Sequence, residues 1–264
     1  NFFLAASLSF LCVIAKAQYD MDPFDKYGPP GFVYTDLKSA LKESKSAYKL
    51  KIEYTPIDPK LVKKLDKLEN LQVLQLTANS LTELPEEITN FKNLVFFACV
   101  GNSIKTLPPN FGNLADLEEL RLQDTQLDSL PFAMVYLGRL GRLEIQNNKA
   151  DTLNFPNSFG YLSNLSDLLV FNSPLDTLPA SFASLKLKSL TLVMCGLTKI
   201  PKSVSQINSL EQLVLDNNKI SHFPKSICSL KNLKTLSLKS NKLYHIPDEI
   251  CKLKKLELLD LRGN

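Results

Sequence analysis

A frame of 23 residues recurs along most of the chain, and it restricts the possible folds more than any other feature. It reads L-x-x-L-x-L-x-x-N-x-L-x-x-L-P-x-x-I-x-x-L-x-x, and residues 71–93, 210–232 and 233–255 follow it closely. Tandem repeats of this length predict a solenoid, in which each unit packs only against its neighbours. The unit at Leu140 is two residues longer, and residues before Leu71 form a degenerate first unit. The units begin at Leu71, Leu94, Leu117, Leu140, Leu165, Leu187, Leu210, Leu233 and Leu256, and positions below are counted from these leucines.

Each fixed position of the frame has a physical reason. L-x-x-L-x-L alternates with a period of two, as in a short strand with one buried face. A single unit cannot bury its leucines, but stacked units with parallel strands about 4.8 Å apart share one core. The asparagine at position nine can satisfy buried backbone groups at the turn. The proline suits the start of a helical segment, and the I-x-x-L spacing predicts a short helix or 3-10 turn.

These residues resemble the leucine-rich repeat family over residues 47–264. The Leu-Pro pair after the turn is similar to the Ras-suppressor-like and plant intracellular subclass. The resemblance implies an α/β solenoid: a right-handed coil with a parallel β-sheet on the concave face and short helical or 3-10 segments on the convex face. It also implies a non-catalytic module that binds a protein, a peptide or a glycan on the concave face, without a cofactor.

The N-terminal residues 1–17 predict a signal peptide that lacks its beginning. Phe2 to Ala15 form an apolar run that ends in a small-x-small cleavage pattern, and the run is too short for a membrane span of about 20 residues. We therefore expect an exported or cell-surface protein without a transmembrane segment. A buried N-terminal helix and a lipid anchor at Cys12 are the alternatives.

Residues 18–46 join this leader to the repeats. They begin with a Pro-, Gly- and Tyr-rich stretch that predicts irregular structure, and continue with a helix that caps the first unit. Asp36 is the expected N-cap of that helix. The array is incomplete at its other end, since it stops at the turn residue Asn264, and we expect the natural protein to continue.

Cysteine and histidine residues are the candidates for a catalytic nucleophile or for metal ligands. Cys195 stands at the turn position of its unit, which indicates a structural role, and a nucleophile would need a histidine nearby. The histidines, His222 and His245, share position thirteen in other units, and two ligands are too few for a usual metal site. Residues at the turn position are Asn79, Asn102, Thr125, Asn148, Ser173, Cys195, Asn218, Asn241 and Asn264. The sequence thus predicts neither an enzyme nor a metal site.

The remaining cysteines fit positions of the frame. Cys99 occupies an inward position, which predicts a core residue. Cys228 and Cys251 share position nineteen of adjacent units, where small residues dominate. Either they fill a tight contact between helical segments, or they form a disulfide in an exported protein.

Positions three, five, seven and eight are expected to point outward from the concave face and to carry specificity. In parallel register Glu119 faces Arg142 and Arg121 faces Glu144, either as part of a binding site or as neutralised charge on a solvated face. An apolar cluster follows, which marks a partner site unless neighbouring side chains or a loop cover it. The candidate ligand-binding residues are Phe96, Glu119, Arg121, Arg142, Glu144, Leu169, Phe171, Val193, Met194 and Val214.

The formal net charge of +4 does not indicate a nucleic-acid partner. An exported interaction module is the leading hypothesis. The alternatives are the sensor portion of a longer chain with an enzyme or anchor domain, and a structural component of the cell surface. The sequence predicts no oligomeric state and does not name the ligand.

Overall fold

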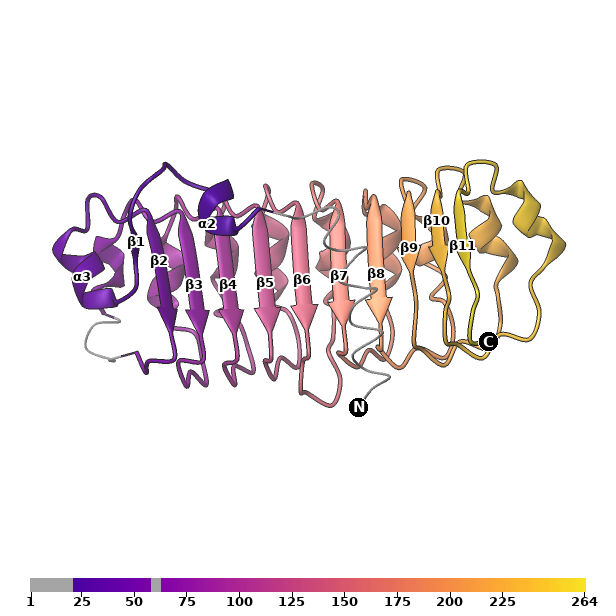
Figure 1. Cartoon of the computed structure of the whole chain (residues 1–264), viewed down its shortest axis with the longest axis horizontal. Coiled ribbons are helices and arrows are strands. Elements are labelled where there is room, and N and C mark those ends of the chain that lie inside the picture. The colour runs from indigo at the N-terminus through magenta and orange to yellow at the C-terminus, as the bar shows by residue number, and fades with distance from the viewer. Residues whose placement is uncertain (1–20, 58–62) are drawn as a thin grey trace.

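The computed structural model describes residues 21–57 and 63–264, so the predicted signal peptide lies outside the described residues. Within them the chain forms one sheet of 11 parallel strands in the order of the sequence (Figure 1). The predicted parallel sheet is confirmed. The strands are β1 (Val33–Tyr34), β2 (Lys49–Glu53), β3 (Val73–Thr77), β4 (Phe96–Val100), β5 (Glu119–Gln123), β6 (Arg142–Gln146), β7 (Asp167–Phe171), β8 (Ser189–Val193), β9 (Gln212–Val214), β10 (Thr235–Ser237) and β11 (Leu258–Asp260).

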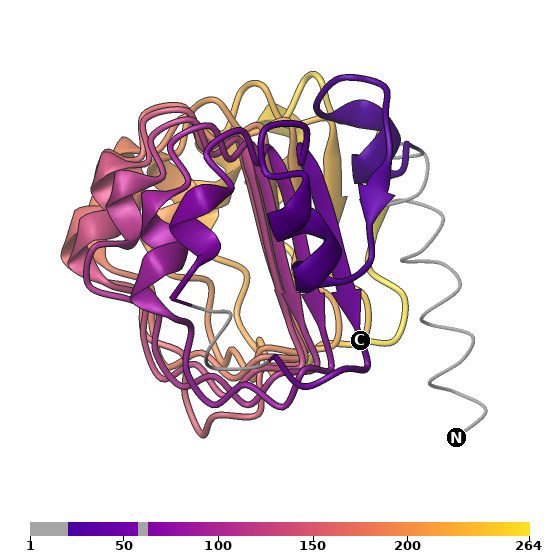
Figure 2. The ribbon, with the colours of Figure 1, turned by 90° about the vertical axis from the view of Figure 1, so that its left-hand side faces the viewer.

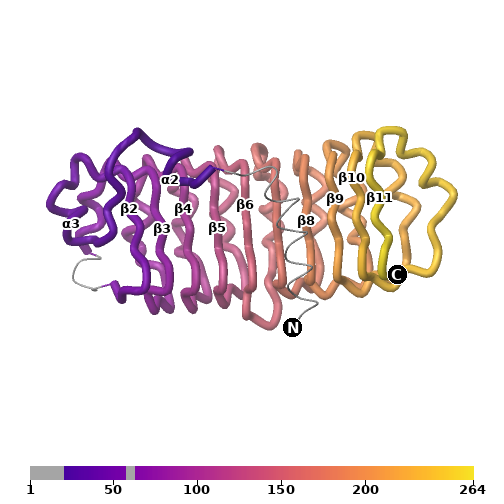
Figure 3. Tube along the Cα trace, viewed as in Figure 1, coloured from indigo at the N-terminus to yellow at the C-terminus, as the bar shows by residue number. Residues whose placement is uncertain are grey.

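The strand register follows the repeat frame. Leu74 pairs with Phe97 and Leu76 with Cys99, so positions four and six of adjacent units lie side by side and are buried in one continuous core. The degenerate first unit supplies β2, which pairs with β3. The extra residues of the unit at Leu140 fall in the loop after β6, which projects below its neighbours (Figure 3).

Short 3-10 segments cover one face of the sheet, the convex side, and the opposite face is the concave face (Figure 2). Six of them begin directly after a proline, which stands at the N-cap with φ between −59° and −76°, the range that the proline ring imposes. They are η1 (Leu65–Lys67), η2 (Glu86–Asn90), η3 (Phe111–Asn113), η4 (Phe132–Tyr136), η5 (Asn157–Tyr161), η6 (Ala180–Ser184), η7 (Val204–Gln206), η8 (Lys225–Ser229) and η9 (Asp248–Lys252).

The 3-10 segments approach one another most closely at position nineteen. A Cβ atom added to Gly160 would lie 2.0 Å from the carbonyl oxygen of Ser181. The small residues of this position therefore permit close packing between units. At the same position Cys228 is buried and Cys251 exposed, and both thiols are free.

Asparagine at position nine connects each turn to the unit before it. The side-chain oxygen of Asn218 accepts hydrogen bonds from the backbone N–H groups of Cys195 (3.0 Å) and Leu197 (3.1 Å). Its amide group donates to the carbonyl oxygen of Leu192 (2.8 Å). Asn102 makes the same bonds to Asn79 and its neighbours. The predicted role in satisfying buried backbone groups is confirmed.

At position eight the first eight units take a left-handed backbone conformation, with φ between +46° and +64° from Ala78 to Ser240. Such angles are uncommon outside glycine, and asparagine and aspartate tolerate them best. This turn directly follows strands β3 to β8. Residues of the series are Ala78, Gly101, Asp124, Asn147, Asn172, Met194, Asn217 and Ser240.

The N-terminal segment is more ordered than its composition predicts. It contains the helix α2 (Pro23–Lys26), the strand β1 and the helix α3 (Leu37–Lys42). The carboxylate of Asp36 accepts a hydrogen bond of 2.8 Å from the N–H of Ser39 at the start of α3. Among the described residues, no helix has the length and apolar character needed to cross a membrane.

Candidate binding surface

The concave face is not open along its whole length. Residues 21–32, called the strap below, carry α2 across the face beside β3, β4 and β5 (Figure 1). Phe24 and Tyr27 of the strap form a separate apolar cluster with Val73, Phe96 and Ala98. The rings of Tyr27 and Phe96 stack with their centroids 5.9 Å apart. Phe96, expected to be open to a ligand, is only 1% exposed because the strap covers it.

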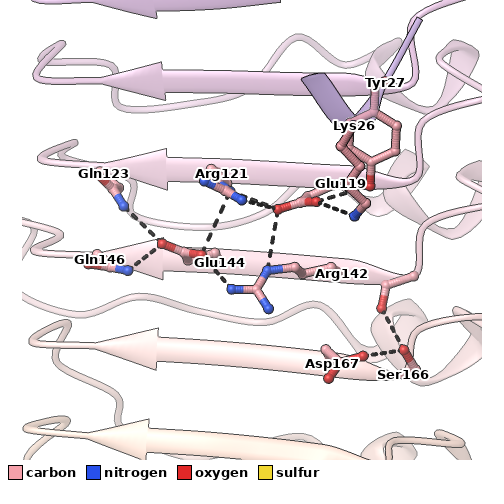
Figure 4. Close-up of polar contacts among 11 residues, drawn as sticks. Lys26, Tyr27, Glu119, Arg121, Gln123, Arg142, Glu144, Gln146, Ser166 and Asp167 are labelled. Atoms are coloured by element: carbon pink, nitrogen blue, oxygen red, sulfur yellow. Dashed lines mark hydrogen bonds and ion pairs between the residues drawn. The ribbon is translucent and has the colours of Figure 1, made fainter. Parts of the chain in front are cut away.

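Charged side chains of β5 and β6 form one network next to the strap (Figure 4). One carboxylate oxygen of Glu119 lies 2.6 Å from Nη2 of Arg121 and 3.4 Å from Nε of Arg142. Its other oxygen accepts hydrogen bonds from Nζ of Lys26 (3.2 Å) and the hydroxyl of Tyr27 (3.0 Å). Glu119 therefore joins the strap to two strands.

Glu144 forms the second centre of the network. It lies 3.0 Å from Nη2 of Arg142 and 3.9 Å from Nε of Arg121. The side-chain amides of Gln123 and Gln146 also donate to it. The register pairs Glu119 with Arg142 and Arg121 with Glu144, as expected from the frame.

The interpretation of this network as charge on a solvated face is wrong. Glu119 is 1% exposed, since the strap covers it, and Glu144 is 5% exposed among its arginine and glutamine partners. Burial raises the pKa of Glu119, but Arg121, Lys26 and Arg142 outweigh burial, and its pKa lies below the ordinary value. The carboxylate is thus held in its ionised form inside a shielded site.

The predicted apolar cluster lies on β7, β8 and β9, beyond the strap. Leu169, Phe171 and Met194 are partly exposed. Val193 and Val214 are buried, so the expectation that all five are open to a partner is wrong for these two. Both are short side chains, and Val193 is the register partner of the larger Phe171. Met194 is the left-handed residue directly after β8.

The structure also places the cysteine and histidine residues that were candidates for catalysis or metal binding. Cys195 is fully buried, and burial raises its pKa to about 12, which disfavours the thiolate that a nucleophile needs. Cys99 is buried in the core, as predicted. His222 and His245 are exposed. No group of three or more potential metal ligands occurs in residues 21–57 and 63–264.

Sequence and structure comparisons agree with the repeat frame. A family model described as "Leucine rich repeat" matches residues 208–264. A solved leucine-rich repeat protein of Leptospira interrogans is 28% identical, with a TM-score of 0.64, over 88% of this chain and 70% of that one. The chain has the leucine-rich repeat fold. None of the curated proteins matches it.

Two more solved leucine-rich repeat structures show what this architecture is similar to. The leucine-rich repeat domain of the type III effector XopL is 25% identical, with a TM-score of 0.66, over 86% of this chain and 81% of that one. The Arabidopsis receptor kinase HAESA, solved with the peptide hormone IDA and the co-receptor SERK1, is 27% identical with a TM-score of 0.58. That match covers 74% of this chain and 34% of the HAESA chain.

Proposed function

We propose that this leucine-rich repeat protein is an exported, non-catalytic module that binds a peptide or protein segment on the concave face of β6 to β9. One observation carries the proposal: a polar strip and an apolar strip lie side by side beyond the strap. Glu144 and Gln146 of β6 are the register partners of Leu169 and Phe171 of β7. Such a pair of strips suits a peptide, since its backbone needs hydrogen-bond partners and its side chains need apolar contact.

Three further points support this function. Phe171, at the end of β7, and Met194, directly after β8, are large, partly exposed apolar side chains. Exposed apolar side chains that cluster often mark partner sites. HAESA, a similar receptor, was solved with a peptide hormone. Export rests on the apolar leader and the cleavage pattern at residues 15–17.

A peptide display library tests the binding site directly. The purified chain should enrich peptides, and the Phe171→Ala variant should bind the enriched peptides at least about fivefold more weakly, the loss expected for an interface residue worth 1 kcal/mol. Tyr136→Ala is the matched control, because Tyr136 is an exposed aromatic residue on the opposite side, in η4. Equal binding by wild type and Phe171→Ala, or equal loss in Tyr136→Ala, would contradict the proposed site.

A further inference from the structure

The strap shows which chemistry the covered part of the concave face accepts. Phe24 enters the apolar cluster with Val73, Phe96 and Ala98. Two and three residues later, Lys26 and Tyr27 both reach Glu119. The surface over β3 to β5 therefore accepts an aromatic side chain at one point. At another point it accepts a cation and a phenol, where Lys26 and Tyr27 reach Glu119 (Figure 4).

Side chains hold the strap in place. The backbone hydrogen bonds that the structure shows for Asp22–Tyr27 remain inside the segment, as in those from Asp25 and Lys26 to the carbonyl of Asp22. One connection uses the strap backbone, where Nζ of Lys49 donates to the carbonyl oxygen of Phe24. The strap thus lies on the sheet like a docked peptide and is not a strand of it.

The repeats remain electrostatically satisfied when the strap is removed. Glu119 keeps its ion pairs with Arg121 and Arg142. Lys49 loses its bond to the carbonyl oxygen of Phe24, but the strap covers this side chain, so its charge gains water when the strap leaves. Nζ of Lys26 returns to water easily, because its side chain is already 38% exposed. What removal exposes is the apolar surface of Val73, Phe96 and Ala98, which favours a new apolar occupant.

The strap is joined to β1 by an exposed segment at its C-terminal end. Residues 28–32 read Gly-Pro-Pro-Gly-Phe, and all five are exposed. Gly28 has φ of +73°, a conformation that side-chain-bearing residues rarely adopt. The next residue, Val33, is anchored by pairing with Lys49. The strap can therefore swing away while β1 and α3 remain in place.

We propose that the concave face over β3 to β5 is a second interaction surface, for peptide segments in which an aromatic residue is followed within three residues by a cation and a phenol. The strap occupies this surface in cis, and such a peptide binds only after the strap leaves. This goes beyond the proposed function, because it concerns other strands and a different ligand chemistry. A tethered occupant has an effective concentration of about millimolar, so it suppresses weak competitors.

The test uses a fluorescent peptide with the sequence of residues 21–32 as the probe. We expect it to bind the full chain carrying Phe24→Ala and Tyr27→Ala at least about tenfold more tightly than it binds the wild type, because weakening the strap frees its surface. Phe32→Ala is the matched protein control: Phe32 is an exposed aromatic residue of the strap that packs edge-on against Tyr34, away from Glu119. This control should bind the probe as weakly as the wild type.

A second peptide probe, with Phe24→Ala and Tyr27→Ala in the same sequence, should not bind the strap-weakened chain. Adding Phe96→Ala to the strap-weakened chain should reduce affinity for the first probe about tenfold or more, which locates the peptide on β4. Absence of binding up to about 1 mM, or equal affinity of wild type and strap-weakened chain, would overturn the proposal. Neither outcome depends on Phe171, so this test and the peptide-library test fail independently.

Hydrogen exchange on the wild-type chain measures whether the strap opens without the rest of the protein, and this measurement does not require the double variant to fold. The amides of Lys26 and Tyr27 donate to carbonyls within the strap. If the strap opens alone, these amides exchange at least about 100-fold faster than the paired amides of β4. Exchange of both groups at one common rate would mean that the strap leaves only when the whole protein unfolds, which contradicts the proposal.

Discussion

The hydroxyl group of Tyr27 donates a hydrogen bond of 3.0 Å to Glu119, a residue 92 positions further along the chain. Through this bond a segment outside the repeats is attached to the middle of the array. The same carboxylate binds Arg121 of its own strand and Arg142 of the next. Glu119 is thus the point at which the strap, β5 and β6 depend on one another.

Replacing Glu119 with glutamine should lower the free energy of unfolding at pH 7 by about 3 kcal/mol, the lower end for breaking a buried ion pair, since Glu144 still pairs both arginines. The pKa of Glu119 is lowered by folding, so its stabilisation is present above the ordinary glutamate pKa of about 4.3 and is lost as the pH falls through the folded value. Urea denaturation of both chains at pH 7 and pH 3 measures this. A difference that grows toward pH 3 would contradict it.

Phe171→Ala should change the free energy of unfolding by less than about 1 kcal/mol, because a partly exposed side chain contributes little to the core. Leu168→Ala, three residues away and buried, should cost roughly 2–5 kcal/mol. Denaturant titration compares the two variants. If both lose the same amount, Phe171 is a core residue and the proposed site is misplaced.

Cys195→Asn should be tolerated within about 1 kcal/mol. The thiol of Cys195 donates to the carbonyls of Val170 and Val193, both at 3.4 Å, and the amide of Asn218 bonds the equivalent carbonyls one unit later. An asparagine at 195 therefore finds the same acceptors. Thermal and urea unfolding measure the change, and a larger loss would show a function for the thiol beyond the turn.

Gly160→Ala should destabilise by about 3 kcal/mol or more, because the added methyl group would lie 2.0 Å from the backbone oxygen of Ser181 and the units must move apart. Gly138→Ala is the control, since a Cβ atom there has its nearest neighbour at 4.0 Å and should change stability by less than about 1 kcal/mol. Calorimetry of the two variants distinguishes a packing effect from a general effect of losing glycine.

The array could be predicted from the sequence because the frame repeats. Each strand, turn and 3-10 segment depends on residues within its own unit and the next, and nine aligned copies make the pattern visible. The same alignment predicted that Glu119 would face Arg142, since equal positions of adjacent units are register partners. Cys195 was identified as a turn residue in the same way.

The strap could not be predicted in this way. Residues 21–32 occur once, carry no periodicity, and contact strands that lie between about 25 and 95 residues further along the chain. The frame therefore predicted an open concave face and missed the burial of Phe96 and Glu119. Phe24 and Tyr27, two aromatic residues close together in a Pro- and Gly-rich stretch, were the available signal, because phenylalanine is often buried.

The asparagine bonds between units also mean that a turn is completed only after part of the following unit has been synthesised. Several turns are completed by the side chain at position nine of the following unit, as with Asn218, 23 residues after Cys195, whose N–H it binds. At about 5–20 residues per second, a ribosome needs roughly 1–5 s to make that residue. A nascent chain that ends within such a unit therefore presents an unfinished turn at its growing end, and translational pauses prolong the exposure of that turn.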